Sequence, residues 1–538
     1  MSISVFRFAH IGLPAFFVGV LSLALAPTLG QYGFQKFVDE LPTLPRIQAE
    51  EGAEITIRIS QIQAQFHRDL PPQPAWGYNG SSPGPVIEVE SGHQLRVHWK
   101  NELPAKHIFA APAGAMTQGQ PDTKAVTHLH GLAVQQNSTT DKVYNNDGWP
   151  DLWTVTGEEQ ITEYPNTESA RLLWYHDHSL GDTGRNVAAG LAGMYIIRDD
   201  FERSLNLPSG NYEVPLIIQG QGFNADGSRF YTRDISAEFY GNSTTVNGKL
   251  YPYMNVEPRK YRFRILNGSN ARTYALQLLD FKSLVPGPKF FQVGSDGGFL
   301  QDLVVLNDPD DPDSPRLTLA PAERADVVID FSKFAGHDLL LHNNSLDPGD
   351  GEMPLPHVML FKVGSALPAP DTSEVPSHLQ TVIRYPEADA VKVRRIEFGS
   401  MKMADGHDML LLNHKAWHDK VEEFPVLGST EIWELVNTLP DAHPFHIHLI
   451  EFQVLDRRSF DVAQYAKTGA VVYVDTAVPP DGNEMGWKDV VRVTPGMVTR
   501  IIMKFGPYAG HYVYHCHILE HEDMDMMRPF DVIAPTSP

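Results

Sequence analysis

Apolar and polar residues alternate in short runs along most of this chain, which is typical of half-buried β-strands. One such run follows a turn at Gly92 and ends at Asn101. A second run of the same plan occupies residues 428–437, and a third occupies 256–267. The three copies form a weak internal repeat, which predicts three structural units of similar plan.

The ends of the three units match as well. Strand-like runs close them at 173–178, 339–344 and 512–517, but paired histidines occur only in the first and last. We therefore expect three β-sandwich domains with metal ligands in two of them. The predicted ranges are 31–200 for the first domain, 201–365 for the second, a proline-rich linker at 366–385, and 386–538 for the third.

Length, composition and net charge narrow the classes of protein to which this chain can belong. The chain has 538 residues, more than the roughly 250–300 at which single cores stop growing, so several domains are expected. Its 42 glycines and 41 prolines, with few amphipathic helical runs, favour an all-β protein. The net charge of −23 argues against nucleic acid as a partner, because binding phosphates needs an excess of lysine and arginine.

Residues 1–30 resemble a secretory signal. Arg7 supplies a positive charge, and the stretch from Ile11 to Ala26 is mostly apolar. The alternative is a membrane anchor, but the run is shorter than the ~20 residues of a spanning helix and Pro14 interrupts it. We expect a secreted protein, extracellular or periplasmic, with no membrane association after removal of the signal. A single cysteine excludes an intrachain disulfide.

Four His-X-His pairs lie in or beside strand-like runs. Residues i and i+2 of a strand face the same way, about 6.5 Å apart, which suits two neighbouring metal ions better than one. Two pairs from the first domain and two from the last are expected to converge at the interface of these domains. The pairs are His128 and His130, His176 and His178, His446 and His448, and His515 and His517.

The only cysteine, Cys516, lies between the last two paired histidines. His521 follows it after five residues and Met526 after ten. A thiolate, imidazoles and a thioether are the ligands of blue-copper electron-transfer sites. Zinc is the rival metal for cysteine and histidine, but the single cysteine, the thioether at this spacing and the number of histidines favour copper.

Together these motifs resemble those of the multicopper oxidases. The motifs run in order as His128-Leu129-His130-Gly131, Trp174-Tyr175-His176-Asp177-His178, His443-Pro444-Phe445-His446-Ile447-His448, and His515-Cys516-His517 followed by His521 and Met526. The segments 66–72, 256–264, 319–324 and 527–530 are similar to the branch of bacterial spore-coat laccase and bilirubin oxidase. The resemblance covers nearly the whole chain after residue 36. It implies three consecutive cupredoxin-like Greek-key β-sandwich domains and four copper ions.

The resemblance also implies which residues hold each copper. The type 1 copper would be held by His443, Cys516 and His521, with Met526 as the weak axial ligand. The type 2 copper would be held by His128 and His446. The type 3 pair would be held by the remaining histidines: His130, His176, His178, His448, His515 and His517.

The same resemblance implies a mechanism. A reducing substrate would dock at the exposed edge of His443, and electrons would pass from Cys516 through the adjoining histidines to the three-copper cluster. Four such transfers reduce one O2 to two waters. Asp147 and Glu522 would supply the protons, although both also suit an ordinary role as hydrogen-bonding groups around the ligands.

The predicted activity is laccase-like oxidation of phenols, aromatic amines or bilirubin-type pigments by a monomer that uses O2. The alternative is a metallo-oxidase. The 15 methionines are scattered, which argues against Cu(I) as substrate, whereas Asp441 before His443 leaves Fe(II) open. A coat or pigment-forming protein would differ in biological role rather than chemistry, and the complete ligand set argues against a copper store without turnover.

Overall fold

The computed structural model describes residues 33–535 except 116, 118, 346–353 and 403–407. Strands dominate these residues and the helices are short, as the alternating pattern predicts. The signal predicted at 1–30 lies outside the described residues. Within the described part, no helix has the length and apolar content needed to cross a bilayer.

The first part of the chain forms two main sheets, ordered β1-β4-β11-β10-β7 and β3-β2-β5-β9, with a short pair β6-β8. Neighbouring strands are often far apart in sequence, as Greek-key connections require. The strands are β1 (Arg46–Ala49), β2 (Ala53–Ala64), β3 (Gln73–Tyr78), β4 (Val86–Glu90), β5 (Leu95–Glu102), β6 (Lys124–Ala125), β7 (Thr127–His130), β8 (Thr154–Val155), β9 (Glu159–Tyr164), β10 (Arg171–Asp177) and β11 (Ala192–Arg198). The helices are α1 (Thr183–Ala189) and α2 (Asp200–Ser204).

The middle part forms one sheet along β15-β14-β12-β17-β22-β19-β20, to which β13 adds, and another ordered β16-β24-β23-β18-β21. The elements are η1 (Gly210–Tyr212), β12 (Glu213–Phe223), β13 (Arg229–Phe230), β14 (Ser243–Val246), β15 (Lys249–Leu250), β16 (Tyr253–Val256), β17 (Lys260–Asn267), β18 (Tyr274–Asp280), β19 (Phe290–Ser295), β20 (Gly298–Leu306), β21 (Leu317–Leu319), β22 (Arg324–Asp330), β23 (Asp338–Asn343) and β24 (His357–Val363).

The last part again forms two sheets, ordered β26-β25-β27-β31-β29 and β30-β28-β32-β33. The elements are η2 (Glu387–Asp389), β25 (Ala390–Lys402), β26 (Asp408–Leu412), β27 (Thr430–Asn437), β28 (His443–Ile447), β29 (Phe452–Ser459), α3 (Val462–Thr468), η3 (Gly482–Glu484), β30 (Val490–Val493), β31 (Met497–Lys504), β32 (Gly510–Cys516), α4 (Leu519–Asp523) and β33 (Met527–Val532).

Each pair of sheets encloses its own apolar core. One core joins Trp99 of β5 to Tyr175 of β10, and another joins Trp433 of β27 to Phe445 of β28. The middle core joins β17 to β23. The predicted plan of three β-sandwiches is therefore confirmed. The predicted borders between the three domains stay a prediction.

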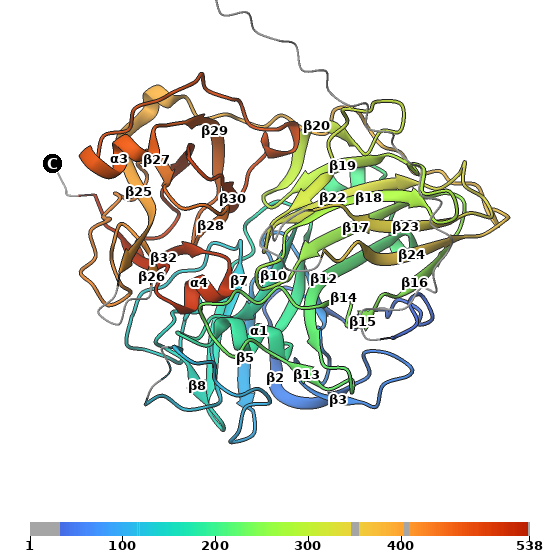
Figure 1. Ribbon diagram of the computed structural model, residues 1–538, viewed down its shortest axis with the longest axis horizontal. Helices are drawn as coiled ribbons and strands as arrows, with labels where there is room; N and C mark the ends of the chain where they lie inside the picture. Colours follow the sequence, from blue (N-terminus) through green and yellow to red (C-terminus); the bar gives the residue numbers. More distant parts are fainter. Residues whose placement is uncertain (1–32, 116, 118, 346–353, 403–407, 536–538) are drawn as a thin grey trace, which may run out of the picture.

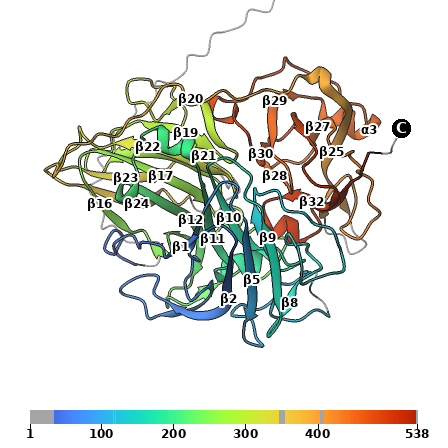
Figure 2. The same ribbon diagram turned by 180° about the vertical axis from the view of Figure 1, so that it is seen from behind.

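The burial pattern of the strands shows where the domains meet. In β5, buried residues alternate with more exposed ones, because one face of its sheet points to solvent. In β10 every residue is buried, since this strand is covered on both faces. Figure 1 shows the three lobes around a common centre, with β7, β10, β28 and β32 near it, and Figure 2 shows the same lobes from behind. The paired histidines lie in or directly after these four strands.

Candidate metal centre

Strand register brings the histidine pairs together two by two. In the first domain β7 pairs with β10, and His128 lies opposite His176. In the last domain β28 pairs with β32, and His446 lies opposite His515. Each sheet therefore presents two neighbouring pairs, and the two sheets face each other across the domain interface.

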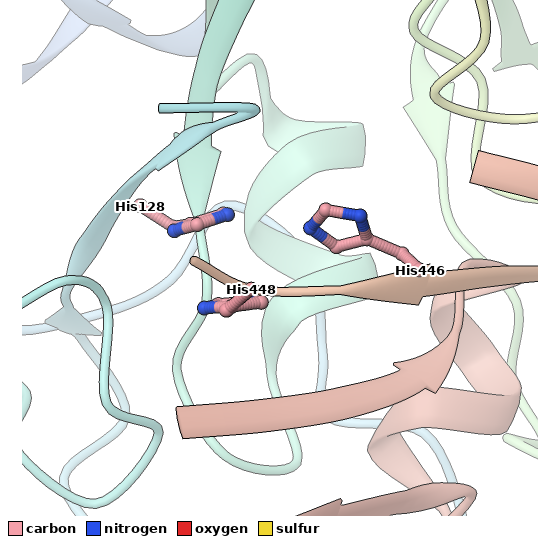
Figure 3. Close-up of side chains that lie close together, drawn as sticks. All are labelled: His128, His446 and His448. Carbon is pink, nitrogen blue, oxygen red and sulfur yellow. The ribbon is translucent and has the colours of Figure 1, made fainter. Parts of the chain in front are cut away.

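The eight paired histidines form one buried cluster, as the sequence predicts. Rings from the two domains stack, His130 on His446 at 3.6 Å between ring centres and His128 on His448 at 3.7 Å. Figure 3 shows His128 and His448 nearly parallel, with His446 beside them. Side-chain ligand atoms gather in three groups made of histidines alone, each with its atoms within 4.8 Å of one another: His128, His446 and His448; His130, His176 and His517; and His178, His448 and His515. A further group joins His130 and His446 to Asp489.

Most of these imidazoles form a hydrogen bond through one ring nitrogen to a protein oxygen. The Nδ1 of His128, His176 and His446 donates to the backbone carbonyl of Asp147, Asp177 and Asp489, at 3.0, 2.8 and 2.8 Å. A hydrogen bond on one ring nitrogen sets the tautomer, so that the other nitrogen carries a free lone pair. In each of these three rings Nε2 is buried and has no hydrogen-bond partner among the described residues.

A second ligand group lies inside the last domain. The Sγ of Cys516 lies 3.5 Å from Nδ1 of His443 and 3.7 Å from Nδ1 of His521. The Met526 side chain is fully buried, and its backbone exchanges hydrogen bonds with Cys516 and His521. The peptide chain joins Cys516 directly to His515 and His517, which belong to two different histidine groups.

Comparisons with known proteins agree with this geometry. Family models described as multicopper oxidase match residues 396–535, and 58–120 with 116–202. A laccase of Bacillus subtilis (strain 168) is 42% identical over 535 residues, covering 93% of this chain and 99% of its own length. The chain belongs to the multicopper oxidase family.

More distant relatives support the same fold and family. A bilirubin oxidase of Albifimbria verrucaria is 32% identical, covering 91% of this chain and 79% of its own. The solved multicopper oxidase McoA of Aquifex aeolicus superposes with a TM-score of 0.74 at 27% identity, covering 92% and 99% of the two chains. The cupredoxin-like fold is thus confirmed. Members of this family use four copper ions, one of type 1, one of type 2 and a type 3 pair.

The residues of this multicopper oxidase fit such ions. Burial lowers the pKa of His128 to about 3, and it lowers the pKa of His130, His176 and His446 well below the usual value. These rings are therefore neutral at physiological pH and ready to bind a metal. Burial also raises the pKa of the Cys516 thiol, so its thiolate form needs a cation beside it.

The two predicted acids both lie at the histidine cluster. Asp147 Oδ1 is 3.2 Å from His128 Nδ1, and Oδ2 is 3.7 Å from His448 Nδ1. Burial raises the pKa of Asp147 well above its usual range. A Cβ on the next residue, Gly148, would lie 2.5 Å from the His128 Cβ, so glycine allows this close approach.

Glu522 contacts two other histidines of the cluster. Its Oε2 is 3.2 Å from His515 Nδ1, and its Oε1 is 3.6 Å from His178 Nε2. The hydroxyl of Thr183 in α1 donates to the same Oε1 at 2.8 Å. Both acids are thus placed at buried histidines, and both contact the group of His178, His448 and His515.

One expectation about the Cys516 group is wrong. His443 has no exposed edge, since it is only 1% exposed and its Nε2 is buried. A partly exposed side chain contacts the other imidazole of this group. Oε1 of Glu238, in the middle domain, accepts from His521 Nε2 at 2.8 Å, and the Glu238 side chain is 18% exposed. Sequence reasoning missed Glu238, because nothing in the local pattern connects it to a histidine in another domain.

Proposed function

We propose that this chain is a laccase-type oxidase, which takes electrons singly from phenols, aromatic amines or bilirubin-type pigments and reduces O2 to water. The observation that carries the proposal is the position of Cys516. It belongs to one buried ligand group and is bonded through the backbone to members of two others. This arrangement connects a one-electron site to a site where several electrons are used together.

We assign the ligands as follows. His443, Cys516 and His521 hold the type 1 copper with Met526 as axial ligand, and His128 and His446 hold the type 2 copper. The six other paired histidines hold the type 3 pair. The three-histidine groups support one further division, with His130, His176 and His517 around one copper and His178, His448 and His515 around the other.

Copper ions bound there supply one-electron oxidation of the donor and four-electron reduction of O2. The chain's own residues connect the two sites and supply protons. Cys516 joins the two sites through its backbone, and the side chains of both sites are buried. Asp147 and Glu522 hold protons within reach of the cluster, the role proposed for them because O2 reduction to water consumes four protons.

The proposed location rests on the N-terminal sequence. The apolar segment at 11–26 after Arg7 supports secretion, to the cell exterior or the periplasm. We propose a monomer whose partners are the small reducing substrate and O2.

A second candidate function has a specific observation in its favour. Glu238 places a carboxylate on the outer nitrogen of His521, and Tyr240 donates its hydroxyl to the other carboxylate oxygen. A negative charge at the point where electrons enter attracts a metal cation such as Fe(II). A ferroxidase activity alongside the laccase activity is therefore the alternative to test.

The first experiment measures steady-state O2 uptake by the copper-loaded protein with a phenol, bilirubin and Fe(II) in parallel. We expect uptake with the phenol or with bilirubin. Uptake with Fe(II) alone contradicts the laccase proposal and supports the metallo-oxidase.

The variant Glu238→Gln separates the two activities. This variant loses the attraction between the Glu238 carboxylate and Fe(II), which is about 1–2 kcal/mol for one charge contact. We therefore expect the KM for Fe(II) to rise about tenfold, with little change in the KM for an uncharged phenol. Glu257→Gln is the matched control. Glu257 is also a middle-domain glutamate that accepts a hydrogen bond from a tyrosine hydroxyl, but its partner is Tyr212 rather than Tyr240. Equal changes for both donors exclude a cation-docking role for Glu238.

A further inference from the structure

Arg324 is a buried arginine of the middle domain that contacts all three domains. It begins β22 and is 1% exposed. Its guanidinium pairs with both carboxylate oxygens of Asp489 in the last domain, at 2.6 and 2.5 Å. It also donates to the backbone carbonyl of Leu172 in the first domain at 3.1 Å, and to the carbonyls of Ala322 and Asp296 in its own domain. Each of its five N–H groups therefore has an acceptor.

Asp489 extends this contact to the histidine cluster. Its Oδ1 accepts from Nε2 of His130 at 3.0 Å, and its backbone carbonyl accepts from Nδ1 of His446 at 2.8 Å. These two rings come from different domains and stack with an interplanar angle of 13°. One residue thus orients a pair of stacked imidazoles across the domain interface.

The contact also selects the metal-binding atom of His130. Because Nε2–H donates to Asp489, Nδ1 is left with the lone pair, and Nδ1 has no partner among the described residues. In His446 the roles are reversed, with Nδ1 bonded and Nε2 free. The two stacked rings therefore offer different atoms to the cluster.

The residue after His130 is a glycine, which leaves room for the Arg324–Asp489 ion pair. Gly131 has φ +92°, and a Cβ there would lie 2.5 Å from Asp489 Oδ2 and 2.9 Å from an Arg324 nitrogen. The carbonyl of Leu172 that Arg324 binds belongs to β10, the strand that carries His176. Arg324 thus holds β10, the strand of one histidine pair, as well as Asp489.

We propose that Arg324 is a positioning residue for the histidine cluster, acting through Asp489. The middle domain, which supplies none of the proposed copper ligands, would in this way set the ring orientations of His130 and His446. The proposal rests on the ligand assignment given above. It concerns the histidine cluster only, since neither residue contacts the Cys516 group in the interactions described.

The test compares Arg324→Lys and Asp489→Asn with the parent protein. Lysine keeps the charge but loses the planar fork, and asparagine keeps the shape but loses the charge. We expect the copper concentration that half-fills the cluster to rise about 10–100-fold, as is usual when a hydrogen-bond partner of a metal ligand is lost. The blue absorption of the Cys516 site is expected to stay unchanged.

The measurements are copper bound per chain over a range of free copper, the type 2 signal in electron paramagnetic resonance, and the blue absorption. Arg394→Lys is the matched control, because Arg394 forms a buried two-bond pair with Glu431 in the last domain, away from the histidine cluster. We expect this control to bind copper like the parent. The thermal midpoint of each copper-free variant shows whether it folds. If Arg324→Lys does not fold, the proposal is tested with Asp489→Asn alone.

Two results overturn the proposal: unchanged copper binding with an unchanged type 2 signal in a folded variant, or an equal loss of blue absorption and cluster copper. The ligand assignment fails separately, if the parent protein itself binds fewer than four coppers or shows no blue absorption.

Discussion

The two ligand groups of this protein are built in different ways. The group around Cys516 comes entirely from the last domain, from β28, the end of β32, α4 and Met526. The eight-histidine cluster takes two pairs from the first domain and two from the last, with Arg324 of the middle domain behind them. The ligands of one group come from a single domain, whereas those of the other come from two domains in contact. Electron uptake and O2 reduction therefore depend on different levels of structure.

The acids around the two groups differ as well. Glu238 lies on the outer edge of His521, where we propose that the donor arrives, and is partly exposed. Asp147 and Glu522 are buried against the histidine cluster, where we propose that they supply protons. The proposed roles thus separate a surface charge that acts on the substrate from buried acids that act on the reaction.

The strongest test of this comparison is Cys516→Ser. A hydroxyl is a poor copper ligand in place of a thiolate, so blue colour and substrate oxidation should both disappear. The histidine cluster should keep its copper, because its ligands come from other residues. Copper analysis, visible absorption and O2 uptake measure the three expectations. Loss of all copper would show that the two groups do not form independently.

A smaller effect is expected from Glu522→Gln and Asp147→Asn. Removal of a proton donor near the cluster should slow reoxidation by O2 about 10²-fold or more, while reduction of the Cys516 site stays normal. Stopped-flow absorption measures both steps. Glu520→Gln is the control, because Glu520 is a buried acid of the same helix that binds Tyr231 and Asn270 instead. Unchanged reoxidation in both test variants removes the proton role.

The copper-free protein should lose stability in acid. Burial lowers the folded-state pKa of His128 to about 3. It lowers the folded-state pKa of six other cluster histidines well below the usual value: His130, His176, His178, His446, His448 and His517. Below about pH 6.5 the unfolded chain therefore binds protons that the folded chain does not. Each such histidine lowers the free energy of unfolding by up to about 1.4 kcal/mol per pH unit as the pH falls. Chemical denaturation between pH 7.5 and 5 measures this slope.

The copper-loaded protein is the control for the acid prediction. Metal on the imidazole nitrogens competes with protons, so the loaded protein should keep its stability further into the acid range. Equal pH profiles with and without copper would show that the cluster does not control acid stability.

Much of this protein follows from local sequence pattern. Alternation in the strands and a threefold repeat predict three β-sandwiches, because both depend on residues close together in the chain. The His-X-His spacing predicts shared faces for the same reason, and the structure brings all eight histidines together. The neighbours of Cys516 predict its ligand group.

Only the tertiary structure decided how these parts act on one another. His130 and Asp489 are 359 residues apart, and Arg324 reaches Asp489 over 165. The burial of His443 and the contact of Glu238 with His521 likewise depend on how domains pack. Sequence periodicity specifies which face a side chain takes within its own strand. It carries no information about which distant side chain will lie against that face, because that is decided by the packing of complete domains.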